Sequence, residues 1–165
     1  MPATLSADVP TIRRLFRVTA PEIQALARVL IDCVEGGASV SFMHPLSMAK
    51  ALAFWSRVAD SSGTIGTVQL VLEQPENQPH RADVSKMLVH RRARRRGIGT
   101  ALMRAAERLA RECGKSLLVL DTASGDAERL YARLGWQLCG EIPGYALLPQ
   151  GGLCATSYFY RTLVD

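Results

Sequence analysis

The chain has 165 residues, of which 48% are apolar and 21% are charged, and its formal net charge at pH 7 is +5. The length and composition fit one globular domain with a buried core, and the length is too short for two domains. A single domain over residues 1–165 is therefore expected. Five arginines fall within positions 91–96, so the basic excess is local and suits one polyanionic ligand better than a long nucleic-acid track.

The N-terminal part of the chain predicts one strand and two helices. Residues 11–18 have the pattern of a strand. Residues 19–22, Thr-Ala-Pro-Glu, form a capping-box pattern that begins a helix with one apolar face, and a pair of glycines ends it. After a loop over residues 38–46, a second helix is expected from residue 48 to about residue 58, with Ser47 as its cap.

The rest of the chain predicts five strands and two helices. Residues 117–120 are a continuous apolar run with a turn on either side, which is typical of a central strand covered on both faces. The other predicted strands are residues 65–73, 82–89, 136–142 and 155–163, and the predicted helices are residues 101–113 and 127–134. Turns or loops are expected over residues 59–64, 74–80, 121–125 and 143–152.

The most informative stretch is Arg94-Arg95-Arg96-Gly97-Ile98-Gly99-Thr100, which joins the strand ending in Met87-Leu88-Val89 to the long helix. A strand that turns through two glycines into a helix leaves free backbone N–H groups at the helix start, at the positive end of the macrodipole. Such a helix start can bind an anionic phosphate. Gly97 and Gly99 have no Cβ, so the backbone can approach that ligand closely.

Other nucleotide-binding loops fit this stretch less well. The dinucleotide-binding fingerprint needs a third glycine where this chain has Leu102, and the Gly-Lys-Ser/Thr of a P-loop is absent. The arginines within residues 91–96 could instead form a nucleic-acid patch or a solvated turn. The order strand, Arg-x-x-Gly-x-Gly, helix favours a cofactor phosphate, so a nucleic-acid partner is not expected.

This loop resembles the acyl-coenzyme A pyrophosphate loop of the GNAT N-acetyltransferases. The predicted element order, β-α-α-β-β-α-β-α-β-β, also matches the GNAT acyl-CoA N-acyltransferase fold, an α/β (α+β) mixed sheet with helices on both faces. Within this superfamily, several segments look like the tabtoxin-resistance type of acetyltransferase. These are Gly36-Gly37-Ala38-Ser39-Val40, residues 81–89, Leu120-Asp121-Thr122, residues 130–136 and residues 140–145.

One departure from the family concerns the sheet. Family members usually carry two strands between the second helix and the strand of Asp83. Here residues 55–72 would have to hold the end of that helix, a turn and both strands, which is too little for standard lengths. Either the helix is cut short and residues 54–59 become a strand, or one strand is shortened or missing.

The resemblance implies acetyl-CoA as the cofactor. The loop from Arg94 to Thr100 would hold its pyrophosphate, and the pantetheine arm would lie along Met87-Leu88-Val89, where a backbone N–H meets the thioester oxygen. Ser124 stands where the family often has an asparagine that contacts coenzyme A. No metal is expected, because His44 has no partner histidine or cysteine at ligand spacing.

Three residues are candidates for acid–base chemistry. Asp83 lies where many GNAT enzymes carry a catalytic glutamate, and Asp121 follows the central apolar strand, where ligands of open α/β sheets gather. Two carboxylates in one cleft would attract a cationic amine. Tyr131 matches the family's proton donor to the leaving thiolate. The structural alternatives are an exposed strand-end charge for Asp83, a turn or cap residue for Asp121, and a core ring with a satisfied hydroxyl for Tyr131.

The implied acceptor is a small-molecule amine, because the tabtoxin-resistance enzymes acetylate a small amino-bearing antibiotic. In the family, the joint between the first two helices forms a substrate wall, so Ser39 and Phe42 are candidate acceptor contacts. The alternative for Phe42 is a plug of the core. Asp83 and Asp121 would face the amine, and Tyr145, on a predicted apolar loop beside the cleft, is a further candidate.

These observations predict an acetyl-CoA-dependent N-acetyltransferase that acts by direct transfer, as a monomer or a homodimer. The alternatives are a protein N-terminal or lysine acetyltransferase, and a non-catalytic sensor of coenzyme A. The four cysteines are scattered without a Cys-x-x-Cys pair, which is typical of reduced thiols. Neither a leader nor a long apolar run is found in the sequence, so a cytoplasmic protein without a membrane partner is expected.

Overall fold

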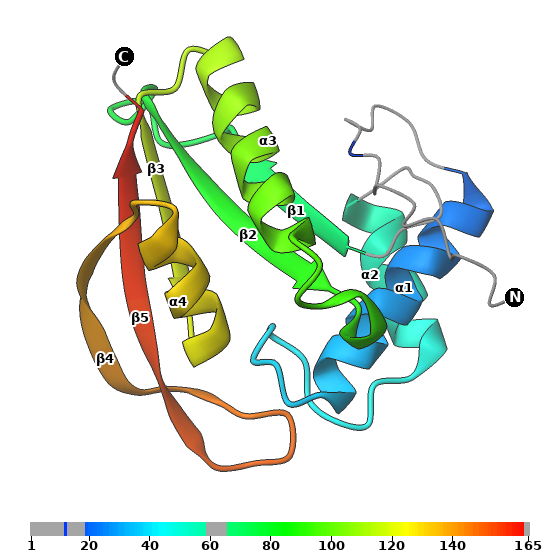
Figure 1. The fold of residues 1–165 in the computed structure, drawn as a ribbon. Helices are drawn as coiled ribbons and strands as arrows, with labels where there is room; N and C mark the ends of the chain where they lie inside the picture. Colours follow the sequence, from blue (N-terminus) through cyan, green and yellow to red (C-terminus); the bar gives the residue numbers. More distant parts are fainter. Residues whose placement is uncertain (1–11, 13–18, 59–65, 164–165) are drawn as a thin grey trace, which may run out of the picture.

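The computed structural model describes residues 12, 19–58 and 66–163 (Figure 1). Within these ranges, two helices precede a sheet whose strands alternate with further helices. The elements are α1 (Ala20–Glu35), α2 (Met48–Val58), β1 (Gly66–Val71), β2 (Arg81–Val89), the short helix η1 (Arg91–Ala93), α3 (Ile98–Glu112), β3 (Leu117–Thr122), α4 (Gly125–Arg133), β4 (Gln137–Leu147) and β5 (Leu153–Thr162).

The described strands form one mixed sheet in the order β1-β2-β3-β5-β4. β2 and β3 are parallel, whereas the other neighbouring pairs are antiparallel. Buried residues of α3 and α4 share one core with the sheet, and α1 and α2 form a second core that includes Leu88 of β2 (Figure 1). The predicted α/β mixed sheet with helices on both faces is therefore confirmed.

A bulge in β2 directs side chains before and after it into different cores. Between residues 85 and 88 two residues of β2 face a single position of β1, and Lys86 adopts a left-handed φ of 47°. An extra residue reverses the alternation of side chains along a strand. Val84 therefore packs in the core of α3 and α4, whereas Leu88 packs in the core of α1 and α2.

The parallel strands β2 and β3 separate along their length. Their pairing covers only Arg81–Asp83 and Leu117–Val119, although β2 continues to Val89 and β3 to Thr122. Beyond the paired residues the two strands diverge, as Figure 1 shows. This opens the sheet at the carboxyl ends of its two parallel strands, where open α/β sheets bind their ligands.

The N-terminal helices begin as predicted. In the capping box of α1, the backbone N–H of Thr19 donates to the Glu22 carboxylate at 2.7 Å. Ser47 Oγ accepts from the backbone N–H of Lys50 at 3.2 Å and so caps α2. No helix of the described ranges combines the length and apolar content that crossing a bilayer requires.

The structure decides part of the question about the missing strand. α2 continues to Val58, so the alternative in which residues 54–59 become a strand is wrong for residues 54–58. Of the described residues between α2 and β2, only those of β1 form a strand. The strand predicted over residues 11–18, apart from Ile12, and the turn predicted over residues 59–64 lie outside the described residues.

The C-terminal hairpin differs from the prediction. β4 continues through Pro143 and Gly144 to Leu147, so the loop predicted over residues 143–152 begins only after Leu147. Both residues fall in an irregular stretch of the pairing with β5, and β4 is an edge strand of the described sheet, where proline is tolerated. β3 also passes its predicted end, because Asp121 and Thr122 pair with β5.

Candidate functional site

A cleft of about 1060 Å³ lies where β2 and β3 diverge. Its walls are the end of α1 with the loop after it, the second half of β2, the turn into α3, the end of β3, and α4. Most residues predicted to bind the cofactor line this cleft, namely Met87, Leu88, Val89, Arg94, Arg95, Gly97, Ile98, Gly99, Thr100, Ser124 and Tyr131. Arg96 is exposed and is not among the lining residues.

The start of α3 is shaped to receive an anion. Gly97 has a φ of 77°, which favours glycine, and a Cβ added there would meet nothing within 4 Å. The N–H groups of residues 98–100 precede the first intrahelical hydrogen bond, which Ala101 N–H donates to Gly97 O at 3.0 Å. Open space beside Gly97, free N–H groups and the arginines of the loop together fit a pyrophosphate.

Asp121 lies at the cleft end of β3, where it is exposed. Its Oδ2 accepts a hydrogen bond from Thr156 Oγ1 of β5 at 3.2 Å, and no described hydrogen bond involves its other carboxylate oxygen. Its charge also reaches Lys86 of β2 and Tyr131 of α4. A carboxylate held in this way can attract a cationic amine and accept a proton from it.

Tyr131 has a buried ring and a hydroxyl beside the cleft. The ring packs at 6.0 Å from Trp136 and 5.7 Å from Phe159, measured between centroids. Burial, and then the charge of Asp121, raises the pKa of Tyr131 well above its ordinary value, so the phenol keeps its proton. No hydrogen bond of the described residues involves this hydroxyl, although Tyr131 lines the cleft. The ring thus packs in the core, and the hydroxyl has no hydrogen-bond partner among the described residues.

Asp83 is not among the lining residues of the cleft. Its Oδ1 accepts from Arg81 Nη1 and its Oδ2 accepts from Gln74 Nε2 at 3.3 Å. The structure therefore pairs Asp83 with a neighbouring cation and does not bring it together with Asp121 in one cleft. A catalytic role for Asp83 stays a prediction.

Of the residues predicted to contact the acceptor, some line the cleft and others lie outside it. Ser39 lines the cleft, whereas Phe42 packs edge-on against Phe54, with ring centroids 5.1 Å apart, in the core of α1 and α2. Phe42 thus packs in the core, as in the alternative interpretation of this residue. Tyr145 lies on β4 outside the cleft, half exposed, and its hydroxyl accepts a hydrogen bond from Tyr158 at 2.9 Å.

The loop after α1 touches the β4–β5 hairpin. The backbone N–H of His44 donates to Pro149 O at 2.8 Å, and Cys154 Sγ lies 3.9 Å from Ser39 Oγ. A second contact joins the same loop to β2, because Lys86 Nζ lies 3.4 Å from Val40 O and 3.3 Å from Ser41 Oγ. These contacts hold the loop after α1 against the hairpin on one side and against β2, which lines the cleft, on the other.

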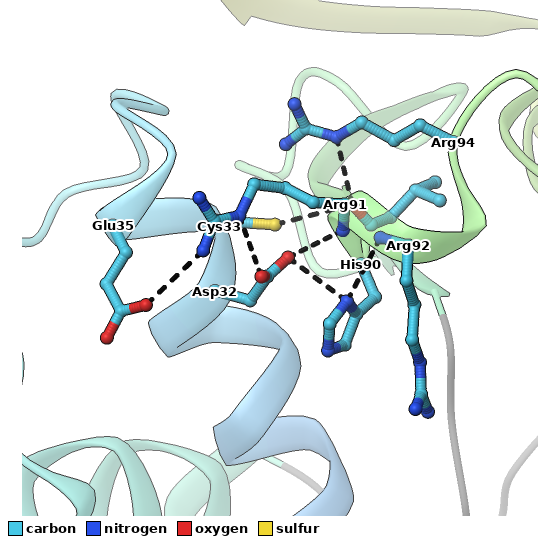
Figure 2. A network of polar contacts seen from close by, with 8 residues as sticks. Asp32, Cys33, Glu35, His90, Arg91, Arg92 and Arg94 are labelled. Carbon is cyan, nitrogen blue, oxygen red and sulfur yellow. Dashed lines mark hydrogen bonds and ion pairs between the residues drawn. The ribbon is translucent and has the colours of Figure 1, made fainter.

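No local sequence pattern indicates that α1 holds the turn before the glycine loop. Asp32 of α1 accepts two hydrogen bonds from Arg91, from the backbone N–H at 2.6 Å and from Nε at 2.8 Å, and its Oδ2 lies 3.3 Å from His90 Nδ1 (Figure 2). Burial by itself would raise the pKa of Asp32, but the hydrogen bonds from Arg91 and the nearby positive charges outweigh burial and lower it. Spacing along the chain could not have revealed the link from Asp32 to Arg91, because it joins residues 59 positions apart.

The end of β2 is held by two further contacts, one from α1 and one from the turn. Cys33 of α1 and Arg94 of the turn both donate to Val89 O, at 3.7 and 3.3 Å.

The chain is similar to known proteins in family and in fold. A family model described as the acetyltransferase (GNAT) family matches residues 23–136. A phosphinothricin acetyltransferase from Sinorhizobium meliloti, solved in complex with AcCoA, is 20% identical, with 90% of this chain and 87% of that chain covered at a TM-score of 0.71.

Two further solved structures have similar folds. A ribosomal-protein-alanine N-acetyltransferase from Brucella melitensis is 21% identical, with 88% of this chain and 97% of that chain covered at a TM-score of 0.68. An N-acetyltransferase from Staphylococcus aureus Mu50 is 16% identical, with 86% and 93% covered at a TM-score of 0.68. At these identities the likeness concerns the fold.

Proposed function

The chain belongs to the acetyltransferase (GNAT) family, and we propose that it transfers the acetyl group of acetyl-CoA directly to the amine of a small molecule of the antibiotic or toxin class. The cleft between β2 and β3 supports this proposal, because it places a phosphate-binding helix start, a carboxylate and a protonated tyrosine around one space. Acetyl-CoA supplies an acetyl thioester when it is bound. The residues from Arg94 to Thr100, without Arg96, would hold its pyrophosphate.

The acid–base roles follow from the positions of two side chains. Asp121 would attract the protonated amine and take up its proton, directly or through a water, since it lines the cleft and only one of its carboxylate oxygens accepts a described hydrogen bond. Tyr131 would give its proton to the departing thiolate, since its phenol is protonated and lines the same cleft. The edge of β2 at Met87-Leu88-Val89 would orient the thioester through backbone N–H groups.

The contacts of the loop after α1 favour a small acceptor over a peptide. A protein acetyltransferase has to admit an extended chain, whereas here the hydrogen bond from His44 to Pro149 bridges the loop after α1 and the β4–β5 hairpin. The contact of Lys86 with Val40 and Ser41 narrows the cleft from the β2 side. An amine on a compact molecule fits such a space, so the tabtoxin-resistance type of substrate remains the class that we propose.

A thiol-release assay with acetyl-CoA tests this function against a panel of small amines and of peptides with a free N-terminus or lysine. We expect turnover with small amines and none above background with peptides. Faster turnover of a peptide would identify a protein acetyltransferase instead. Binding of acetyl-CoA without turnover of any acceptor would identify a coenzyme A sensor.

The control for the cofactor site is a pair of glycine variants, Gly97→Val and Gly99→Ala, titrated with acetyl-CoA by calorimetry. Gly97→Val should lose binding, because a branched residue disfavours the φ of 77° and its side chain would fill the space beside the helix start. Gly99→Ala should bind nearly as well as the wild type, since its Cβ meets only a terminal methyl group of Leu130, at 3.0 Å, which a small side-chain shift can relieve. Equal losses in the two variants would contradict the assignment of the loop.

Asp32 is expected to act on acetyl-CoA affinity through Arg91. Asp32→Asn should raise the KM for acetyl-CoA with little change in kcat or in the KM for the amine, because it loosens the turn that precedes the loop. It should also cost about 1–3 kcal/mol of unfolding free energy at neutral pH, as expected for a lost charged hydrogen bond at a buried site. The folded pKa of Asp32 is lowered, so this contribution is present at neutral pH and disappears as the pH falls through that pKa.

The matched control is Glu35→Gln, which removes a second carboxylate from the same Arg91. That pair is longer, at 3.4 Å, and half exposed, so its loss should change neither the KM nor the stability measurably. Steady-state kinetics and denaturant unfolding of both variants check this prediction. A kcat loss for Asp32→Asn at an unchanged KM for acetyl-CoA would show that Asp32 does not act through the loop.

A further inference from the structure

Lys86 occupies an unusual place in the cleft. It lies at the bulge of β2 with a φ of 47°, directly before the Met87-Leu88-Val89 edge along which the thioester is proposed to lie. Its side chain is half-buried and lines the cleft, on the same space as Asp121 and Tyr131. The proposed roles of the site residues leave Lys86 without a function.

The ammonium group of Lys86 has only neutral contacts. Its Nζ lies 3.4 Å from Val40 O, 3.3 Å from Ser41 Oγ and 5.9 Å from the centroid of the Phe54 ring. No ion pair of the described residues includes Lys86. Burial lowers the pKa of Lys86, and the charge of Asp121 opposes this shift only in part. Burial of an ammonium without a paired carboxylate shifts its equilibrium towards the neutral, nucleophilic form.

We propose that this enzyme acetylates its own Lys86, which makes Nζ of that lysine a modification site within the acceptor end of the cleft. The inference rests on the proposed function, because acetyl-CoA is the donor. In the step, the neutral Nζ attacks the thioester carbonyl carbon, a C–N bond forms, and the C–S bond breaks. Nζ loses one proton, and the departing coenzyme A thiolate takes up one proton, so no oxidant or further reactant is needed.

The product suits the surroundings of Lys86 better than the ammonium does. Acetylation removes a charge that forms no ion pair among the described residues and is opposed only by the more distant Asp121, so the cost of burying that charge disappears. The amide keeps one N–H, which can donate to Val40 O or Ser41 Oγ. Acetyl-Lys86 would also occupy part of the space in which a small acceptor binds, so modification should compete with turnover of the acceptor.

The chain offers internal controls for this proposal, because it has three lysines, Lys50, Lys86 and Lys115. Lys50 is exposed on α2. Lys115 Nζ donates to Leu72 O at 3.0 Å and to Pro79 O at 2.8 Å, and Lys115 is not among the residues that line the cleft. Both report the background reaction of any lysine with acetyl-CoA in the same sample.

The experiment incubates the purified full chain with acetyl-CoA carrying a deuterated acetyl group and follows each lysine by peptide mass spectrometry. We expect Lys86 to be labelled at least about tenfold faster than Lys50 and Lys115, because its reaction is intramolecular within the complex. Labelling should saturate with acetyl-CoA, be independent of protein concentration, and fail in Gly97→Val and in urea-unfolded chain. Labelling of Lys86 at the rate of the other two lysines, or equally in the unfolded chain, overturns the proposal.

A second readout needs no acetyl-CoA. Trace labelling of the free protein with acetic anhydride at neutral pH measures the nucleophilicity of each amine directly, and Lys86 should exceed Lys115. Lower reactivity of Lys86 than of Lys115 would overturn the inference. Lys86→Arg should abolish the acetyl label at position 86 without unfolding the protein, whereas Lys50→Arg should leave the labelling of Lys86 unchanged.

The outcomes separate this inference from the proposed function. If small amines are acetylated while Lys86 stays unlabelled, the self-acetylation fails and the proposed function stands. If Lys86 is labelled while no small amine is turned over, the self-acetylation stands and the proposed acceptor class fails. If acetyl-CoA does not bind at all, both are overturned.

Discussion

Asp121→Asn is expected to slow amine acetylation by about 10²–10⁴-fold, the usual cost of removing a positioned base. Asparagine keeps the size of the side chain and an oxygen that can accept from Thr156 Oγ1, so the fold and the affinity for acetyl-CoA should change little. Raising the pH should partly restore the rate, because more of the amine is then neutral without a base. Single-turnover rates across pH, with calorimetry for acetyl-CoA, measure both effects.

Asp83→Asn provides the matched comparison on the neighbouring strand. Asp83 contacts Arg81 and Gln74 and does not line the cleft, so its amide variant should keep most of the activity. A wild-type rate for Asp121→Asn would refute Asp121 as the base. An equal and large loss in both variants would restore the two-carboxylate site that the sequence predicts.

The geometry of the turn into α3 could be predicted because its signal is local. A strand, two glycines and a helix start are adjacent in the sequence, and the φ of Gly97 follows from the turn that joins them. The same holds for the capping box of α1 and for Ser47 at α2. In each case the residues that decide the geometry lie within a few positions of one another.

The side of the cleft formed by the loop after α1 and by the bulge of β2 could be predicted less well, because its contacts are long-range. The bulge at Lys86 depends on how β2 pairs with β1, and nothing in the residue types of β2 indicates an extra residue. The contact of His44 with Pro149 and the link from Asp32 to Arg91 join segments far apart in the chain. The extension of β4 through Pro143 likewise depends on its place at the sheet edge, which composition does not reveal.

These differences change which residues matter for specificity. Phe42 and Tyr145, the aromatic candidates, lie in the core and on the outer strand, whereas Ser39, Lys86 and Asp121 line the cleft. The lining next to Asp121 is therefore more polar than the sequence suggested. A search for the acceptor should accordingly begin with compact polar amines rather than with aromatic ones.

Tyr131→Phe separates a catalytic hydroxyl from a structural ring. The variant keeps the ring that packs against Trp136 and Phe159 and removes only the oxygen. If the phenol protonates the leaving thiolate, the chemical step should slow by about 10²-fold, the low end for a lost general acid, at an unchanged KM for the amine. The melting temperature should stay nearly constant, because no described hydrogen bond of this hydroxyl is lost.

The pH dependence sharpens this last test. Because burial and Asp121 raise the pKa of Tyr131, the wild-type phenol stays protonated throughout the alkaline range in which amines become neutral. The wild-type rate should therefore rise with pH and show no loss from ionisation of the tyrosine. The rate of the Tyr131→Phe variant should rise with pH in parallel, at a lower level. Measuring kcat and thermal unfolding on one sample decides between the two roles. A Tyr131→Phe protein that melts early yet turns over at the wild-type rate would leave Tyr131 a core residue only, and the proton for the thiolate would have to come from solvent.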